Sequence, residues 1–229
     1  MRNGPKLVIG IIICFVALFV VLRLLKSTGI AVLYQVPTTS NAPYMEPGDY
    51  IFISKWAPLE KNKFISYTRK DSILGYLKFI HRLVASPGDT LEIKGSIVYV
   101  NGINIDKEFQ LKHMYSVDAT MKPEILSIRP DLELDGYRVS TSEYWVHLTS
   151  ETANQLSSQP NLKITPKEQG SEQLNNQFDA RWNFDHFGPI IMPKGKYFVL
   201  GDNRHNSRDS RVTGYVDNTD IIGVLILKF

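Results

Sequence analysis

An uninterrupted apolar run near the N-terminus constrains the fold of this chain more than any other feature. Residues 7–22 read LVIGIIICFVALFVVL without a charge, and two leucines extend the run beyond Arg23. A helix of about 20 apolar residues spans the hydrocarbon core of a bilayer, and an arginine near its end can reach the interface with its charged group. We therefore expect one transmembrane helix over residues 7–25, preceded by a short N-terminal segment, residues 1–6.

A cleaved signal peptide is the alternative for this segment, because it also combines a basic start with an apolar run. The run is long for such a signal, and residues 28–31, Thr-Gly-Ile-Ala, make a poor cleavage site. Orientation is weakly determined, because two basic residues precede the run and Arg23 and Lys26 stand at its other end. We expect an uncleaved anchor with residues 1–6 in the cytoplasm.

Composition excludes several classes of partner. The 229 residues carry a formal net charge of +3, and the basic residues are scattered, whereas a nucleic-acid-binding face gathers them into a stripe. The single cysteine, Cys14, lies in the apolar run, so the sequence allows neither an intrachain disulfide nor a cysteine metal site. We expect no nucleic-acid partner, no metal and no cofactor.

Short apolar runs between turn residues predict a mainly β protein after the anchor. Residues 190–229 have this character, and so do four strand-like segments bounded by Pro-Gly, Lys-Gly and Asn-Gly turns, namely residues 49–55, 76–84, 90–93 and 97–100. We expect these strands to build one core from two stretches of chain, residues 30–105 and 188–229.

The middle of the chain, residues 106–187, is more polar and irregular. It holds one helix candidate, Thr149–Ser157, which Thr149 or Ser150 can cap and which ends before a proline. We expect this segment to be a β-rich or irregular subdomain inserted into the core.

Three polar segments carry the candidate chemistry. The first, residues 36–49, is a Pro-rich loop that contains Ser40, and the second, residues 79–89, contains His81 and ends in a Pro-Gly turn. The third, residues 201–211, reads GDNRHNSRDSR between two apolar runs. A hairpin needs only two turn residues, so the length and polarity of this loop indicate that it holds side chains for a task.

These segments, in this order behind an N-terminal anchor, resemble the sequence boxes of bacterial type I signal peptidases. The resemblance covers the anchor and both ends of the core but not residues 106–187. It rests on Pro37, Ser40, Pro43, Gly48 and Asp49 in the first box, on Arg82, Pro87, Gly88 and Asp89 in the second, and on Gly201, Asp202, Asn203, Ser207, Asp209, Ser210 and Arg211 in the third.

The resemblance implies a coiled, largely antiparallel β core and a membrane-bound serine endopeptidase. Such enzymes remove signal peptides from exported preproteins after small residues, on the outer side of the bacterial cytoplasmic membrane. The implied partners are therefore preprotein signal peptides and the lipid bilayer.

The resemblance also assigns roles within the site. Ser40 stands at the nucleophile, and His81 stands where the bacterial enzymes carry a general-base lysine, although relatives in the endoplasmic reticulum and archaea have histidine there. Thr38 stands where the family has an oxyanion donor beside the Ser40 N–H, and Ser207 or Asp209 stands where a residue orients the base. The structural residues of the boxes are Gly201, Asp202, Asn203, Arg211 and Arg82.

Histidine changes the acid–base requirement of the site. A lysine must have its pKa lowered far below about 10.4 to accept a proton, whereas the reference pKa of histidine is about 6.5. We expect activity to fall as pH drops through roughly 6 to 7. Lys78 is a poor substitute base, because an odd offset along a strand points it to the face opposite His81.

Several alternatives remain open on the sequence. Asn41 stands where the family has Met, and a second alignment puts Tyr44 at the nucleophile instead of Ser40. The chain can be a degenerate homologue that binds signal sequences or partners without cutting. A self-cleaving repressor would need a DNA-binding domain where this chain has its anchor, and a specialised peptidase for pilin or conjugation substrates is a further alternative. The other histidines, His113, His147, His186 and His205, show no ligand spacing and are expected on the surface or in packing.

Overall fold

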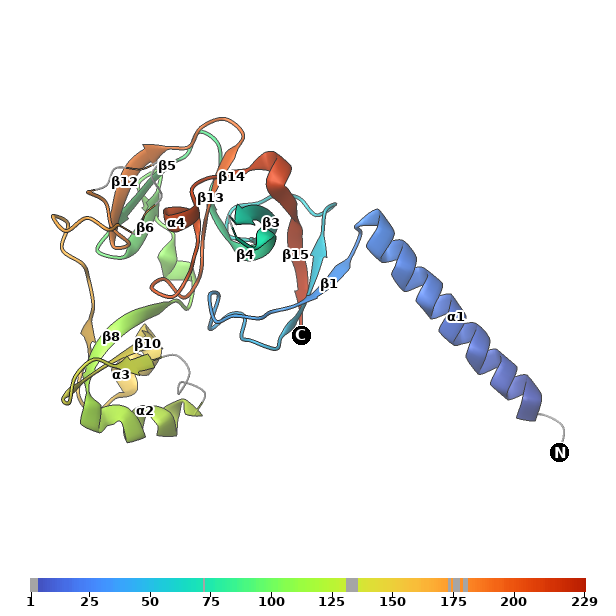
Figure 1. Ribbon diagram of the computed structural model, residues 1–229, viewed down its shortest axis with the longest axis horizontal. Helices are drawn as coiled ribbons and strands as arrows, with labels where there is room; N and C mark the ends of the chain where they lie inside the picture. Colours follow the sequence, from blue (N-terminus) through green and yellow to red (C-terminus); the bar gives the residue numbers. More distant parts are fainter. Residues whose placement is uncertain (1–3, 72, 131–135, 173, 175–177, 179–180) are drawn as a thin grey trace.

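A computed structural model describes residues 4–71, 73–130, 136–172, 174, 178 and 181–229. One long helix, α1 (Gly4–Thr28), projects from a body built of β-sheets (Figure 1). Among the described residues, α1 is the one helix long and apolar enough to cross a membrane. It contains the predicted anchor and extends beyond it at both ends.

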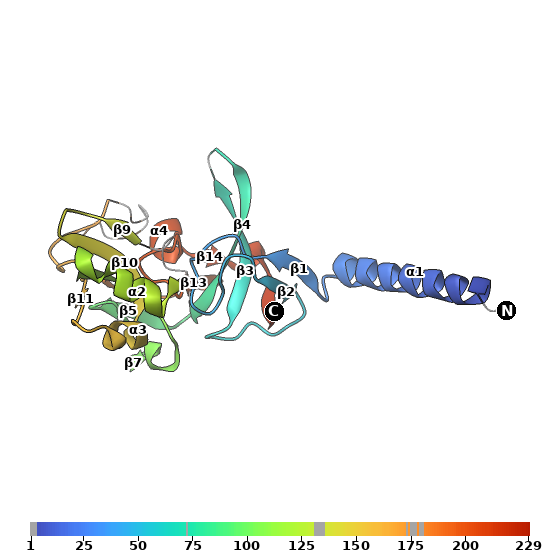
Figure 2. The ribbon, with the colours of Figure 1, turned by 90° about the horizontal axis from the view of Figure 1, so that it is seen from below.

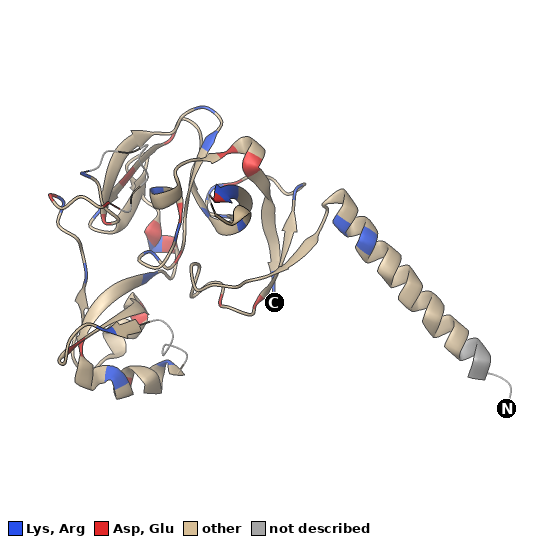
Figure 3. Ribbon diagram, viewed as in Figure 1, with Lys and Arg blue, Asp and Glu red and all other residues tan. Residues whose placement is uncertain are grey.

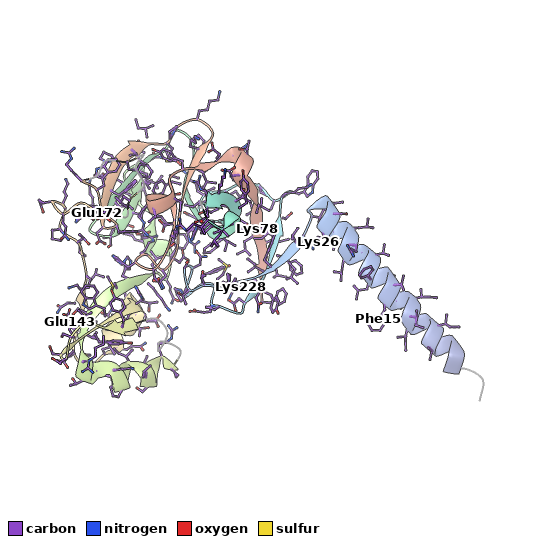
Figure 4. The ribbon with its side chains drawn as sticks, viewed as in Figure 1. Phe15, Lys26, Lys78, Glu143, Glu172 and Lys228 are labelled. Atoms are coloured by element: carbon purple, nitrogen blue, oxygen red, sulfur yellow. The ribbon has the colours of Figure 1, made fainter. Side chains whose placement is uncertain are left out.

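Among the described side chains of α1, residues 8–28, the exposed surface is apolar until the last turns. Phe15 points away from the helix into open space, and the described basic residues of α1 lie next to the β body (Figures 3 and 4). The helix ends at Gly29, whose φ of +70° favours glycine at this position. Trp56 then donates its indole N–H to the Thr28 carbonyl at 3.1 Å, so the helix end is attached to the first sheet.

The first sheet is antiparallel and brings both ends of the chain together in the order β1-β2-β15-β3-β4-β13-β14. Its strands are β1 (Val32–Gln35), β2 (Tyr50–Ser54), β3 (Phe64–Asp71), β4 (Gly75–Ala85), β13 (Lys196–Leu200), β14 (Val216–Asp217) and β15 (Ile221–Lys228). The long hairpin β3–β4 projects from the body (Figure 2). Strand β3 is absent from the sequence prediction, because its second half, Thr-Arg-Lys-Asp, is polar.

A second sheet, in the order β12-β5-β6-β7, extends the core. Its strands are β5 (Thr90–Lys94), β6 (Ile97–Val100), β7 (Ile103–Asn104) and β12 (His186–Ile191). Phe187 and Phe198, both buried, pack their rings 5.3 Å apart between centroids and so join this sheet to β13 of the first. The predicted strands at 90–93 and 97–100 are confirmed.

A third sheet, β11-β8-β10-β9, lies apart from the hairpin β3–β4 and is covered by two short helices (Figure 1). Its elements are β8 (Lys112–Asp118), α2 (Lys122–Ile128), β9 (Gly136–Arg138), β10 (Glu143–Thr149), α3 (Ser150–Gln155) and β11 (Asn161–Leu162). Val146, Leu148 and Ile125 belong to its own apolar core.

Of the two alternatives expected for the inserted segment, β-rich or irregular, β8 and β10 agree with the first. Their buried and partly exposed side chains do not alternate strictly, so the strands are hard to recognise in the sequence. The predicted helix is confirmed as α3, where Thr149 caps the helix by accepting the Thr152 N–H at 3.1 Å. The helix ends before Ser157, sooner than predicted.

Candidate active site

Ser40 lies in the loop between β1 and β2, where the third polar segment holds it through the backbone. Its carbonyl accepts the Asn203 N–H at 3.0 Å. On the other side, the Asn41 amide donates to the Ile80 carbonyl at 2.7 Å. The loop that contains Ser40 is thus tied to β4 one residue before His81, so the first two polar segments meet as the resemblance implies.

Gly201 explains how the third polar segment comes so close. A Cβ atom at this position would overlap both the Ser40 carbonyl oxygen and the Ser207 side chain. Only glycine permits this approach of two backbones. The position of Ser207 beside Ser40 therefore depends on Gly201.

His81 is buried on β4 with a partner on each ring nitrogen. Its Nδ1 lies 2.9 Å from the Tyr67 hydroxyl, and its Nε2 lies 3.2 Å from Ser207 Oγ. Burial lowers the pKa of His81 to about 4; the negative charge of Asp209 opposes this change, and the positive charge of Arg211 adds to it. The imidazole is therefore neutral at physiological pH, as a general base must be.

Within the described residues, no hydrogen bond joins Ser40 to His81. Ser40 Oγ instead accepts the Thr38 hydroxyl at 3.2 Å. The hydroxyl hydrogen of Ser40 remains available for donation. Ser207 occupies Nε2 in this state.

Asp209 does not contact His81. Its carboxylate accepts from the Arg211 guanidinium at 2.7 and 3.0 Å and from the Gly201 N–H at 3.1 Å. Burial would raise the pKa of Asp209, but Arg211 holds it below its ordinary value. Of the two residues expected to orient His81, only Ser207 reaches its ring. Asp209 acts on His81 through charge alone, because its carboxylate is paired with Arg211.

Arg82 fixes the start of the third polar segment. Its guanidinium makes two bonds to the Asp202 carboxylate, at 2.8 and 2.5 Å, and lies over the rings of Phe64 and Phe109. Asn203 continues the attachment by donating from its amide to the Thr39 carbonyl at 3.3 Å. These contacts position the loop backbone rather than any reacting atom.

The two competing candidates lie elsewhere. The Tyr44 ring stacks on Phe64 with centroids 4.9 Å apart, so it is directed away from His81 and its partners. Lys78 is exposed and lies 3.4 Å from the Tyr34 hydroxyl (Figure 4). Its position on the other face of β4 agrees with its odd offset from His81.

A cleft of about 860 Å³ opens beside Ser40 and Ser207. Its opposite wall comes from the third sheet, through Met114, Tyr137 and His147. The sequence does not predict this wall, since His147 is expected on the surface or in packing and residues 106–187 only as a β-rich or irregular insertion. A bridge between β8 and the third polar segment, with the Lys112 N–H bonded to the Asp202 carbonyl at 2.9 Å, holds the two sides together.

His205, also expected in packing, lines the same cleft. Its Nδ1 accepts the Met114 N–H at 3.2 Å, and its Nε2 lies 2.7 Å from the Asp185 carboxylate. This ring therefore links the third sheet to the segment before β12. Within the described residues, no group of acidic, histidine or cysteine side chains forms a metal site.

Comparison with known proteins gives a consistent result. A family model described as "Signal peptidase, peptidase S26" matches residues 7–229. A signal peptidase I of Aquifex aeolicus is 29% identical over 211 residues, covering 85% of this chain and 73% of that protein. A signal peptidase IB of Staphylococcus aureus is 26% identical over 229 residues, covering 97% and 87%.

Two further relatives match about three quarters of this chain. The signal peptidase I P of Bacillus subtilis subsp. natto is 30% identical over 178 residues, which is 73% of this chain and 64% of that protein. A crystal structure of a signal peptidase I from Enterococcus faecalis matches 76% of this chain and all of its own, at 22% identity and a TM-score of 0.34. That TM-score is too low to add to the description of the fold.

Proposed function

The chain belongs to the signal peptidase family S26 of serine peptidases, and we propose that it removes signal peptides from exported preproteins at the outer face of a bacterial cytoplasmic membrane. Family membership, the apolar helix α1 and a cleft beside Ser40 support this function. The substrate carries its own apolar segment, so anchoring both molecules in one bilayer raises their effective concentration.

In the proposed reaction, Ser40 Oγ attacks the scissile carbonyl while His81 Nε2 takes the hydroxyl proton. His81 then returns this proton to the leaving amine. The Thr38 hydroxyl and the Ser40 N–H stabilise the oxyanion, an effect worth about 3–4 kcal/mol per donor in such sites.

Ser40 must turn toward His81 when substrate binds, because its Oγ is bonded to Thr38 in the free protein. Catalytic hydrogen bonds are often incomplete before substrate is present. Ser207 is hydrogen-bonded to Nε2 in the free protein, and Ser40 replaces it there as the reaction begins.

The observation that carries the proposal is a neutral, buried imidazole held next to the loop of Ser40. Ser207, at 3.2 Å, shows where a second hydroxyl can approach Nε2. A lysine in this position would need the same burial merely to become neutral, whereas burial of histidine secures a state it already favours.

Cleavage of a preprotein with small residues before the scissile bond tests the proposal, with the full-length chain in detergent. Ser40→Ala and His81→Ala should each lower kcat by about 10⁴-fold or more, whereas Tyr44→Phe should match the wild type. Persistent cleavage by Ser40→Ala together with loss in Tyr44→Phe would overturn the assignment of the nucleophile.

A degenerate homologue that binds signal sequences without cutting is the second candidate. The absence of a Ser40–His81 hydrogen bond among the described residues favours it. It predicts that the wild type binds a signal peptide but yields no product even after prolonged incubation.

A further inference from the structure

We propose that the wall of the cleft formed by the third sheet binds the substrate residues that follow the scissile bond and favours an aromatic side chain among them. This third-sheet wall consists of Met114, Tyr137 and His147. The inference rests on the proposed function, because it takes the substrate to be a preprotein cut at Ser40. It gives the inserted segment, which lies outside the three polar segments, a role in substrate choice.

One face of the third sheet is turned toward the cleft and the other toward the sheet's own core. Met114 of β8 pairs with His147 of β10, and Tyr137 of β9 pairs with Trp145, two residues before His147. Paired residues share a face of a sheet, and so do alternate residues of one strand. These four side chains therefore lie on one face, whereas Val146 points to the opposite face and is buried in the apolar core of the sheet.

Backbone hydrogen bonds fix the third-sheet wall at the edge of the site. The Lys112 N–H donates to the Asp202 carbonyl and the Arg204 N–H donates to the Lys112 carbonyl, both at 2.9 Å. Two residues further along β8, the Met114 N–H donates to His205 Nδ1 at 3.2 Å. Strand β8 therefore runs beside the third polar segment, and the wall is held at a fixed position relative to that segment.

The core side of the same cleft carries the proposed chemistry. Ser40 and Ser207 line it together with Val212 of α4 (Ser210–Thr213). The cleft has a volume of about 860 Å³, and cavities of this size accommodate ligands much larger than one side chain. A peptide bound at Ser40 therefore has room to reach the third-sheet wall.

The position of α1 decides which part of the substrate reaches this wall. The chain leaves α1 and runs through β1 toward the third sheet, and Ser40 follows in the loop after β1 (Figures 1 and 2). The apolar segment of a signal peptide occupies the same bilayer as α1. A substrate that extends from the bilayer meets Ser40 first and the third-sheet wall afterwards, so the residues after the scissile bond lie against the wall.

The chemistry of the wall suits an aromatic side chain. Tyr137 is 50% exposed and offers its ring to the cleft, and Met114 Sδ lies 3.7 Å from its hydroxyl. Aromatic rings and thioethers both provide apolar contact area for a ring. Trp145 packs against Tyr137 with centroids 5.8 Å apart and donates its indole N–H to Glu143 at 2.6 Å. Because this hydrogen bond fixes Trp145, it also holds the Tyr137 ring in position.

Peptides that differ only after the scissile bond test the inference. A reference peptide carries serine at the first five positions after the bond, and five others each replace one of these serines by phenylalanine. With the full-length wild type in detergent, we expect kcat/KM to be about 10-fold higher for one phenylalanine peptide than for the reference, mainly through KM, as for one well-packed contact. Tyr137→Ala should remove this preference.

Two control variants distinguish the contact from a loss of fold. Tyr137→Phe keeps the ring and should keep the preference for phenylalanine. Tyr99→Ala removes a partly exposed tyrosine of β6, away from the third-sheet wall, and should keep the preference as well. A preference that survives in Tyr137→Ala, or that the wild type lacks at all five positions, would refute the inference.

Binding to Ser40→Ala separates this inference from the proposed function. The fluorescence anisotropy of labelled, uncut peptides gives their Kd, which should be about 10-fold lower for the favoured phenylalanine peptide than for the reference. Adding Tyr137→Ala should abolish the difference. If the wild type cuts no peptide but this difference is present, the proposed function fails and the role of the wall stands. If the wild type cuts both peptides but they bind alike, the role of the wall fails and the proposed function stands.

Discussion

Two buried polar clusters meet beneath the cleft, and they differ in charge. The charged framework consists of three ion pairs, Arg82–Asp202, Arg204–Asp106 and Arg211–Asp209. The neutral site consists of three groups that can both donate and accept hydrogen bonds, namely His81, Tyr67 and Ser207. Buried charges need fixed partners, whereas hydroxyls and imidazole can exchange donor and acceptor roles. The loop is thus held by one cluster and the proposed chemistry is carried by the other.

Asp209 and Arg211 connect the charged framework to the neutral site through their charges. The Asp209 carboxylate is bonded to Arg211. The charge of Asp209 opposes the lowering of the His81 pKa by burial, whereas the charge of Arg211 adds to it. The framework therefore influences His81 without a hydrogen bond to its ring.

Breaking the charged framework should have the largest effect on stability. Arg82→Met leaves the Asp202 carboxylate buried and unpaired, which should lower the free energy of unfolding by about 3–5 kcal/mol. Lys94→Met is the control, because it breaks an exposed pair with Glu92 and should cost at most about 1 kcal/mol. Urea titrations of the detergent-solubilised protein measure both; equal losses would contradict the distinction.

Lowering the pH should destabilise the fold, because two buried neutral histidines, His81 and His113, resist protonation in the folded chain. His81 and His113 have pKa values of about 4 and 3 in the fold, against about 6.5 when unfolded. Between these values the unfolded chain binds more protons, so stability falls as pH drops below 6.5 and levels off below the folded values. His81 alone should account for about 3 kcal/mol.

Urea midpoints measured from pH 7 to 4 test this dependence. His81→Gln and His113→Gln should each flatten the curve. A wild-type curve that stays flat down to pH 4 would mean that these rings are not buried in the neutral form.

Removing Ser207 from the neutral site should have the smallest effect. Ser207→Ala removes a single hydrogen bond to Nε2 that the proposed reaction breaks, so kcat should stay near the wild-type value or rise by at most about 10-fold, while the lost bond lowers the free energy of unfolding by about 0.5–1.5 kcal/mol. Ser127→Ala, which removes an exposed hydroxyl in α2, should change neither. A loss as large as that of His81→Ala would make Ser207 part of the chemistry itself.

The polar boxes of the sequence predict the charged framework better than the neutral site. Arg82, Asp202, Asp209 and Arg211 all lie in recognisable boxes, and their pairing follows from opposite charge. Tyr67 lies in β3, a strand that the sequence does not predict because its second half is polar. Its contact with His81 depends on the register of β3 against β4, which local sequence does not set.

The cleft, too, is only partly predictable from the sequence. One wall follows from the boxes around Ser40 and Ser207, whereas the other comes from β8 and β10. Half-exposed strands such as these mix polar and apolar residues without a clear period. Their place opposite Ser40 is determined by the tertiary bridge from Lys112 to the third polar segment.

The pH dependence of kcat/KM tests the central claim, that a buried neutral histidine is the base. The wild type should keep its activity well below pH 6 and lose it only near pH 4, lower than the sequence alone suggests, because burial lowers the pKa of His81. A wild-type profile in which kcat/KM falls near pH 4, together with loss of activity in His81→Ala, would support the account. Activity that rises only above about pH 8, and that survives in His81→Ala, would contradict it and indicate a lysine base.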